Sequence, residues 1–592
     1  MNKTRLIKTT RKKELFIYLI FIVISCWYAC TLAYSGKLIA QNDAFFHLQR
    51  LQQIYLNLKH GVFFTFIATD TFRHIGVGSF LFYPTAFYYP IAILEFVFKP
   101  ITAIYIYLGL AMFLTFCCAY VSMKTFSKSI QRAFIFSMVY TLCAKYIIEF
   151  TRFQFGEFFA YSFIPIVFLG FYQVVYSTNK KTLFNTIPIS SLNLGIGLAL
   201  IVTCHLLSAF LCILLMLILL IIQILRRKIN KYVLFSLIEN VIVFFLLAGW
   251  VIFPLFMDYF GNNISSAKPG FNAPTSFEGL WFSSFQNQIF SNYSDVCIGI
   301  VLILTFCIGW LFIRNNYLEL SIYSIGFFLV IISTSLFPWA SLQRLPFLAF
   351  LSVLQYSFRF LILAVFFLSV SSSYIICYLI NACSNKNFSY LLVFVFVILL
   401  ILSSYQILES IKLYQNNNFT YLKKNYKDKN ILPPNPVILN NHNFNYVVNY
   451  RPPIGDLDYV NNNSFGNSNG ISMENNEVIV NNKKRILSPY LSPNIIEYKI
   501  KVNDDSVIDL PIVPYKHSIV TVNGKETNWD VSKRGSICLR VSKGTKSICV
   551  TYKPYSLFYV LFIISLVSYI SILYLLPKSK RLIQIRLISN SH

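Results

Sequence analysis

The sequence has few charged residues for its length. Only 12% of its 592 residues are charged, whereas 56% are hydrophobic and 17% are aromatic. This balance lies outside the range of soluble globular proteins and within that of chains that cross a membrane many times. The composition therefore predicts a polytopic α-helical membrane protein.

Several motifs that would indicate other functions are missing. The 13 cysteines include no Cys-x-x-Cys pair and no Cys/His spacing typical of metal sites, and eleven lie in or beside apolar runs, as small buried side chains do. No RNA- or DNA-binding motif accompanies the net charge of +27. The basic residues instead form short clusters between apolar runs, where they set membrane orientation. We therefore expect membrane lipids, and no nucleic acid, as partners.

Cys538 and Cys549 differ from the other cysteines because they flank a stretch with strand character. This stretch, "LRVSKGTKSI", predicts a β-hairpin that turns at Lys543-Gly544 and brings the two sulfurs opposite each other. In such a hairpin the two cysteines form a hydrogen-bonded pair, whose Cα atoms are wide apart. The sequence therefore leaves a disulfide between them open.

Twelve apolar runs have about the 20 residues that a helix needs to span a membrane. The first follows the basic segment "MNKTRLIKTTRKK" and has no cleavage site after it, which is typical of a cytoplasmic anchor. The runs lie at about 14–35, 101–122, 131–150, 158–177, 184–204, 206–225, 231–256, 295–313, 317–337, 359–381, 388–410 and 555–576.

A further run at 78–97 is ambiguous because it contains Pro84, Pro90 and Glu95. If this run does not fully cross the membrane, four basic clusters all fall on the cytoplasmic side, where loops of membrane proteins carry an excess of Lys and Arg. These clusters are residues 124–132, 179–181, 226–231 and 578–581. We therefore predict about twelve spans with both termini cytoplasmic and with 78–97 as a re-entrant or steeply tilted element. The alternative is 13 or 14 segments.

Three parts follow from this topology. Residues 1–410 form a multi-span domain with a first outer loop at 36–100, and residues 555–592 form a last transmembrane helix with a basic cytoplasmic tail. Between them, residues 411–554 are rich in Asn and Pro up to about 470 and then contain strand-like runs such as "IIEYKIKV". Turn signals such as Asn523-Gly524 separate the runs, so we predict an extracytoplasmic β-sandwich.

The stretch "QNDAFFHLQR" (41–50) carries three ionisable groups after the first apolar run. As a helix it places Asp43, His47 and Arg50 on one face, at i, i+4 and i+7. A carboxylate close to the bilayer boundary is typical of a functional site, although Asp43 could also be solvated on an outer loop. Arg50 suits either a phosphate or a salt bridge to Asp43. For His47 the choices are a hydrogen bond to that carboxylate and a substrate contact.

Five other residues on the predicted outer face are candidates for substrate binding. Asp70 could orient an acceptor or help to hold a divalent cation, but it has no second acid in Asp-x-Asp spacing, so a metal is not favoured. Glu157 is either a helix-boundary charge or a functional acid, with Gly156 allowing a close backbone approach. His205 is either a turn residue that bonds the backbone or a substrate contact. Gln355 and Arg359 begin a span where a lipid phosphate would lie, although an arginine can also snorkel there.

The order of these motifs resembles that of YfhO-like bacterial membrane proteins. It also resembles the membrane family labelled "6-pyruvoyl-tetrahydropterin synthase-related", and both are similar to glycosyltransferases of the GT-C type. The resemblance rests on "NDAFFHLQRL", "GEFFAYSFIP", "CHLLSA" and "LQYSFRFL", followed by "DLPIVPYKHSIVTVNGK" in the outer domain and one last span.

The resemblance implies a sugar transfer on the outer face, from a polyprenyl-phosphate-linked donor to a cell-envelope glycan, polymer or lipid. Asp43 would be the base that deprotonates the acceptor hydroxyl. Arg359, and with it Arg50, would neutralise the phosphate leaving group. No second acid stands beside Asp43 as in metal-dependent members, so we expect no cofactor and favour a mechanism without a divalent cation.

Two other classes of protein stay open. Transporters and lipid flippases place ionisable groups near the bilayer midplane on broken helices, and Lys145 and Glu239 are the main groups of that kind here. A structural scaffold that displays the β-domain is the other alternative.

Overall fold

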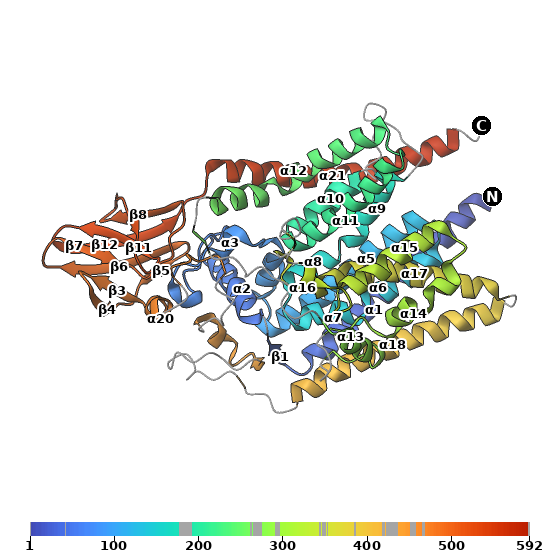
Figure 1. The fold of residues 1–592 in the computed structure, drawn as a ribbon, viewed down its shortest axis with the longest axis horizontal. Helices are drawn as coiled ribbons and strands as arrows, with labels where there is room; N and C mark the ends of the chain where they lie inside the picture. The colour runs from blue at the N-terminus through green and yellow to red at the C-terminus, as the bar shows by residue number, and fades with distance from the viewer. Residues whose placement is uncertain are drawn as a thin grey trace.

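The structure is a computed structural model, mostly helical, with a separate β-rich region near the C-terminus (Figure 1). It describes residues 2–41, 43–176, 192–260, 263–264, 275–289, 296–342, 345, 351, 353–383, 386–416, 421, 436–449, 458–464 and 468–589.

Eight segments in this part of the chain are helical, long and apolar enough to cross a membrane. α8 (Phe155–Tyr161) and α9 (Ile164–Val175) make a ninth if the 48° bend between them lies within one broken span. These helices are consistent with a membrane protein. The eight are α1 (Asn2–Ala33), α5 (Pro100–Ser127), α6 with α7 (Ile130–Thr141 and Ala144–Thr151), α11 (Leu206–Leu225), α12 (Lys231–Tyr259), η5 with α17 (Ser357–Phe360 and Leu361–Ala382), α18 (Lys386–Asn416) and α21 (Ser556–Ser589).

Each of the twelve apolar runs contains a helix within the part of the chain that the structure describes, but three of these helices are short. These are α10 (Asn193–Val202), α14 (Ile300–Ile313) and α15 (Tyr317–Ile332), with 10, 14 and 16 residues. At 1.5 Å per residue they reach about 15–24 Å, less than the ~30 Å hydrocarbon core of a bilayer. The number of twelve spans therefore stays a prediction. Shorter helices outside the runs are α13 (Phe277–Phe285), α16 (Trp339–Leu342), η6 (Phe444–Asn449) and α20 (Ser468–Glu474).

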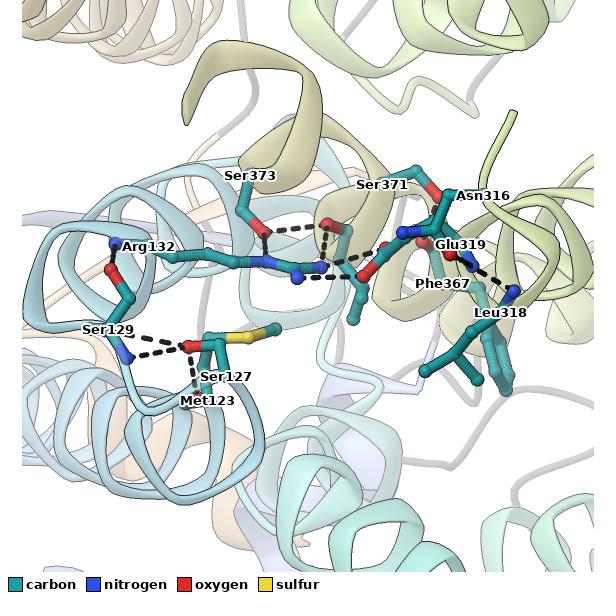
Figure 2. A network of polar contacts seen from close by, with 11 residues as sticks. Met123, Ser127, Ser129, Arg132, Asn316, Leu318, Glu319, Phe367, Ser371 and Ser373 are labelled. Atoms are coloured by element: carbon teal, nitrogen blue, oxygen red, sulfur yellow. Dashed lines mark hydrogen bonds and ion pairs between the residues drawn. The ribbon is translucent and has the colours of Figure 1, made fainter. Parts of the chain in front are cut away.

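A buried ion pair joins three of the helices (Figure 2). Arg132 on α6 donates two parallel hydrogen bonds to Glu319 on α15, at 2.7 and 2.8 Å, and a third to the Ser373 hydroxyl on α17 at 3.2 Å. The side chain of Asn316 caps α15 by accepting from the Glu319 amide, and Ser129 caps α6 in the same way. The pair is 11% and 4% exposed. Because both charges are nearly buried, each depends on the other for compensation.

Glu319→Gln is expected to destabilise the protein by about 3 kcal/mol, because it leaves the Arg132 guanidinium buried without its counter-ion. The measurement is thermal unfolding of the detergent-solubilised protein. Glu409→Gln is the matched control, since Glu409 pairs with Lys412 at 3.0 Å but both side chains are 35% exposed. The control is expected to cost less than about 1 kcal/mol. Equal melting temperatures for the two variants would contradict the structural role of the Arg132–Glu319 pair.

Residues 36–100, which are predicted to form the first outer loop, begin with β1 (Lys37–Ala40) and α2 (Ala44–Lys59), and the first ten residues of α2 are all buried. Residues 78–97 contain only α3 (Ser79–Phe82), η2 (Ala86–Tyr88) and α4 (Tyr89–Leu94), none long enough to cross a membrane. Past α4 the chain exposes apolar side chains, including Val97 at 78%. Exposed apolar side chains of this kind are suited to the interface of a bilayer.

The β-domain contains two five-stranded antiparallel sheets around its own apolar core, as predicted for a β-sandwich. One sheet has the order β10-β11-β7-β3-β4 and the other β5-β6-β12-β8-β9. The strands are β3 (Glu477–Val480), β4 (Lys483–Ile486), β5 (Tyr490–Ser492), β6 (Ile495–Val502), β7 (Ser506–Asp509), β8 (Ser518–Val522), β9 (Lys525–Glu526), β10 (Asp530–Val531), β11 (Ile537–Val541) and β12 (Gly544–Tyr552).

The hairpin predicted between Cys538 and Cys549 is wrong. Cys538 lies on β11, which pairs with β7, whereas Cys549 lies on β12, which pairs with β6 and β8 in the other sheet. Both cysteines are free. Since each strand has its own apolar face, the turn at Lys543-Gly544 connects the two layers of the sandwich instead of two neighbours within one layer.

The β-domain packs directly on the first outer loop. The Asn494 side chain accepts from the Phe66 amide and donates to the Phe64 carbonyl, both at 2.8 Å. The Gly78 amide donates to the Tyr515 hydroxyl at 2.6 Å. A second link is the pairing of β1 with β2 (Val437–Asn440), which lies just before the β-domain. The two regions therefore share an interface of hydrogen bonds between distant parts of the chain.

Candidate functional site

Asp43 stands at the N-cap of α2, and its carbonyl accepts from the His47 amide at 3.0 Å. Its side chain is exposed, yet burial by the surrounding protein raises the pKa of the carboxyl to about 6. Arg359 opposes this rise and Glu157 adds to it. The carboxyl thus reaches solvent although protein surrounds it, and the name Asp43 recess is used below for the place where it lies beside Arg359 and Glu157. Such a group is poised to take up a proton near neutral pH.

Arg359 and Glu157 meet beside Asp43 and form an ion pair, with 3.3 Å between Nε and Oε1. Arg359 comes from η5 and Glu157 from α8, and their side chains are only 14% and 5% exposed. Nη2 of Arg359 donates to Oε1 of Gln355 at 3.1 Å. Nη1 of Arg359 and Oε2 of Glu157 have no hydrogen-bond partner among the described residues. The guanidinium therefore keeps donor capacity for an anionic group.

His205 caps the N-terminus of α11 next to this pair. Its Nδ1 accepts from the Ser208 amide at 3.3 Å and is hydrogen-bonded to the Ser208 hydroxyl at 2.9 Å. Burial lowers the pKa of the imidazole to about 4. The negative charge of Glu157 raises this pKa, and the positive charge of Arg359 lowers it. The ring is therefore neutral at pH 7 and carries its proton on Nε2, which makes Nε2 a donor.

Gly156 allows α8 to reach His205. A Cβ atom at this position would lie 2.6 Å from Cδ2 of His205 and would also meet the Tyr83 hydroxyl. No larger residue fits without moving one of these rings. The close backbone approach predicted at Gly156 is confirmed, and it brings Glu157 next to His205.

Arg50 and His47 do not make the bonds predicted for them. Arg50 forms no ion pair with Asp43; it is fully buried and donates to the Tyr83 carbonyl at 2.7 Å. Its guanidinium lies 4.7 to 5.5 Å from four aromatic rings, those of Phe46, Phe80, Tyr83 and Tyr88. His47 is hydrogen-bonded to the Tyr88 hydroxyl at 2.5 Å and not to the carboxylate.

These bonds within the protein indicate a structural role for Arg50 and His47. Asp43 precedes the helical part of α2. The hydrogen-bonding groups of Arg50 and His47 are instead paired with residues 83–88, which supply carbonyls, aromatic rings and a hydroxyl. His47 and Arg50 are therefore buried inside the protein, although helical spacing places them on the same face as Asp43. The two residues fix residues 83–88 against α2 and so shape the recess indirectly.

Asp70 lies apart from the other candidates. Its carboxylate accepts from the Gln53 side chain at 3.1 Å and from the Thr69 hydroxyl at 3.0 Å. Gln53 stands nearly three turns along α2 from Asp43, which corresponds to about 15 Å. The side chain of Gln53 also accepts from the amides of residues 69–71, so Asp70 belongs to the hydrogen-bond network of this loop.

Asp458 is a further acid whose electrostatic environment includes Asp43. Burial and the charge of Asp43 raise the pKa of its carboxyl to about 6. The ring of the neighbouring Tyr459 stacks on Phe82 at 5.5 Å, and burial raises the pKa of its hydroxyl. The signal in the sequence was the run "GDLDY", in which two acids stand within an otherwise acid-poor stretch. The first of them, Asp456, lies outside the described residues.

A second charged pair lies deeper, within the segment 130–151. Lys145 and Glu149 form an ion pair on α7, and both side chains are at most 1% exposed. The ammonium group of Lys145 lies 5.3 Å from the ring of Phe358, next to Arg359. The segment is broken between α6 and α7, immediately before Lys145. The buried Lys145–Glu149 pair therefore lies within the helical body, close to Phe358 and so to Arg359.

Comparisons with known proteins add no family. No protein-family model matches the chain, and no curated protein matches it. Among the described residues no group of three or more His, Cys, Asp or Glu side chains is arranged to hold a metal ion. The site is therefore defined by its geometry: Asp43, Glu157, His205, Arg359 and Asp458 come from five separate parts of the chain.

Proposed function

We propose that the protein is a membrane glycosyltransferase of the GT-C type with about twelve spans. It moves a sugar from a polyprenyl-phosphate-linked donor to a cell-envelope glycan, polymer or lipid on the outer face of the membrane. The observation that carries the proposal is the recess around Asp43, where an accessible, desolvated carboxylate lies beside an arginine with unused donors.

In the proposed reaction the acceptor hydroxyl attacks the anomeric carbon of the donor sugar. A bond forms between that oxygen and the carbon, the bond from the carbon to the phosphate oxygen breaks, and polyprenyl phosphate leaves with the electron pair. Asp43 takes the hydroxyl proton. Arg359 stabilises the charge that develops on the phosphate, because a guanidinium matches phosphate oxygens in pairs. Neutral His205 contributes a donor to a substrate oxygen through Nε2.

Comparison of glycans and lipids in cells with and without the gene tests this function. Loss of one sugar substituent, restored by the wild-type gene and not by Asp43→Asn, is the expected result. The purified protein in lipid nanodiscs should then transfer labelled sugar from a polyprenyl phosphate to an extract of the mutant envelope. An unchanged profile combined with a transport defect would overturn the proposal.

A transporter or lipid flippase is the second candidate, because the Lys145–Glu149 pair lies inside an apolar segment whose helix is interrupted between Thr141 and Ala144. Buried ion pairs on broken helices are typical of ion and substrate pathways. Lys145→Met with Glu149→Leu removes both charges together, which avoids leaving one of them unpaired. A transporter would lose flux in proteoliposomes with this double variant, whereas a transferase should keep its chemistry at Asp43.

The proposed topology places residues 411–554 outside the cell. Protease added to intact protoplasts is therefore expected to degrade this region, while a cytoplasmic marker protein stays intact. The experiment uses an epitope inserted at Gly524, a glycine with open space around it in an exposed turn. Permeabilised protoplasts control for access of the protease. Full protection of the epitope in intact protoplasts would contradict the topology.

A further inference from the structure

A cavity of about 200 Å³ lies where residues 63–89 meet α12, α21 and the end of the β-domain. Its walls are mostly apolar and aromatic, and the protein encloses it only in part. Apolar cavities of about 150 Å³ stay free of water and take up small apolar molecules. The cavity is therefore suited to an apolar group and not to a sugar or an ion.

Two walls of the cavity belong to helices that can border lipid. α12 contributes Trp250 and Pro254, and α21 contributes Phe558. Both helices are long and apolar enough to cross a membrane, yet only 17% and 11% of their most apolar windows are buried inside the protein. The two helices pack on each other and lie side by side along the top of Figure 1. In a bilayer, lipid chains therefore surround this pair next to the cavity.

The walls are held in place by contacts between distant parts of the chain. The ring centroid of Phe66 lies 5.6 Å from that of Tyr552, and the ring centroid of Phe64 lies 5.0 Å from that of Phe562. The Tyr552 hydroxyl donates to Oδ2 of Asp258, near the end of α12, at 2.6 Å. The cavity is therefore a feature of the packed fold.

Two exposed lysines stand beside the cavity at the end of the β-domain. Lys553 directly precedes Pro554, which lines the cavity. The Lys553 amide donates to the His517 carbonyl at 3.2 Å, so Lys516 lies on the neighbouring segment. The side chain of Asp258, which lies 3.8 Å from His517, is only 2% exposed. Positive charge on the surface thus borders an apolar cavity, a pattern that fits an anionic lipid.

We propose that this cavity binds one acyl chain of an anionic phospholipid, whose head group lies at Lys516 and Lys553. The chain gives the aromatic walls packing partners that an empty cavity lacks, and the lysines attract the phosphate. Because the walls come from residues 63–89, from both helices and from the end of the β-domain, the bound lipid joins these parts. The site does not depend on sugar transfer, since a transporter with this fold would bind the same lipid.

Binding is measured by native mass spectrometry of the full-length protein in mild detergent, with phosphatidylglycerol and zwitterionic phosphatidylcholine as probes. We expect phosphatidylglycerol to bind about 10-fold more tightly than phosphatidylcholine, a scale that two lysines at a membrane surface can supply. Lys516→Ser with Lys553→Ser should abolish this preference. The matched control is Lys525→Ser with Lys533→Ser, which removes two exposed lysines elsewhere in the β-domain. Equal affinities of the wild type for the two lipids would overturn the assignment of the head group.

The place of the chain is tested with Ala86→Trp, which fills the cavity from η2. We expect this variant to bind phosphatidylglycerol about 10-fold more weakly, because the added ring takes the space of the chain. Leu246→Trp adds the same ring to α12 at a position that is 43% exposed, and it should bind as the wild type does. Equal binding by the two variants would place the lipid outside the cavity.

Photolabelling locates the chain without a substitution. Phosphatidylglycerol with a diazirine at the end of one chain should label the residues of the cavity walls, which lie within 63–66, 80–89, 250–254 and 552–562. Labelling of α12 and α21 alone, without residues 63–66 and 80–89, would overturn the site.

Polyprenyl phosphate is the competing occupant, because Tyr83 lines the cavity and its ring lies 5.8 Å from that of His205. Added in an amount equal to the photoreactive phospholipid, polyprenyl phosphate should leave the labelling unchanged. Displacement of the phospholipid would assign the cavity to the donor lipid and overturn the proposal. A protein that keeps the labelled site but transfers no sugar would support the lipid site and reject the proposed function instead.

Discussion

Asp43→Asn is expected to lower sugar transfer by a factor of about 10² or more, the usual scale for losing a general base. The amide has the size of the carboxylate but does not accept the proton of the acceptor hydroxyl. Because the Asp43 side chain makes no capping hydrogen bond to α2, the variant should fold and insert as the wild type does. The measurement is transfer of labelled sugar by equal amounts of purified protein.

The pH dependence of the wild type gives a second readout of the same group. Burial raises the pKa of Asp43 to about 6. The base works only when deprotonated, so the rate should rise through pH 6 and level off above it. Asp70→Asn is the control, since Asp70 is bonded to Gln53 and Thr69 away from the recess. Full transfer by a well-expressed Asp43→Asn protein would assign the base to Glu157 or another acid.

Arg359→Ala is expected to have the second largest effect, a loss of about 10² in the use of the lipid donor. Two causes combine in this variant. The phosphate loses its guanidinium, and Glu157 stays nearly buried without its ion-pair partner. The second cause also destabilises the fold, so a loss of activity in Arg359→Ala alone does not identify a phosphate contact.

Arg359→Lys separates the two causes. Lysine keeps a positive charge for Glu157 but lacks the planar fork that binds two phosphate oxygens. We expect a melting temperature close to that of the wild type, with a raised KM for the donor and intermediate transfer. Arg314→Ala, at an exposed arginine after α14, controls for a general loss of positive charge. Wild-type kinetics in both Arg359 variants would show that the residue only anchors the helix end.

Much of the architecture was accessible from the sequence because it follows from local patterns. Apolar runs predicted helices, alternating runs predicted the strands of the sandwich, and the positions of the basic clusters predicted that 78–97 does not fully cross. The ends of these elements bring Asp43, Glu157, His205 and Arg359 together, as expected if they share one face of the membrane.

The errors arose where a side chain is satisfied by a partner that is remote in sequence. Charge and helical spacing suggested Arg50 as a partner for Asp43, but the carbonyls and rings of residues 80–88 enclose it. Alternation predicted that β11 and β12 pair with each other, whereas each pairs within a different sheet. Asp458 lies far from Asp43 in the sequence, so only the folded chain shows that the charge of Asp43 helps to raise the pKa of its carboxyl.

The pairing of β1 with β2 has a consequence for biosynthesis. Lys37–Ala40 leave the first apolar helix early, but their hydrogen-bonding partners, Val437–Asn440, follow only after α18. During insertion the N-terminal strand therefore has an unpaired edge until nearly all the helices have entered the membrane. A nascent chain in this state exposes backbone donors and acceptors that a chaperone could cover. Formation of the recess at Asp43 would then be one of the last steps of assembly, after the ribosome has passed the helical region.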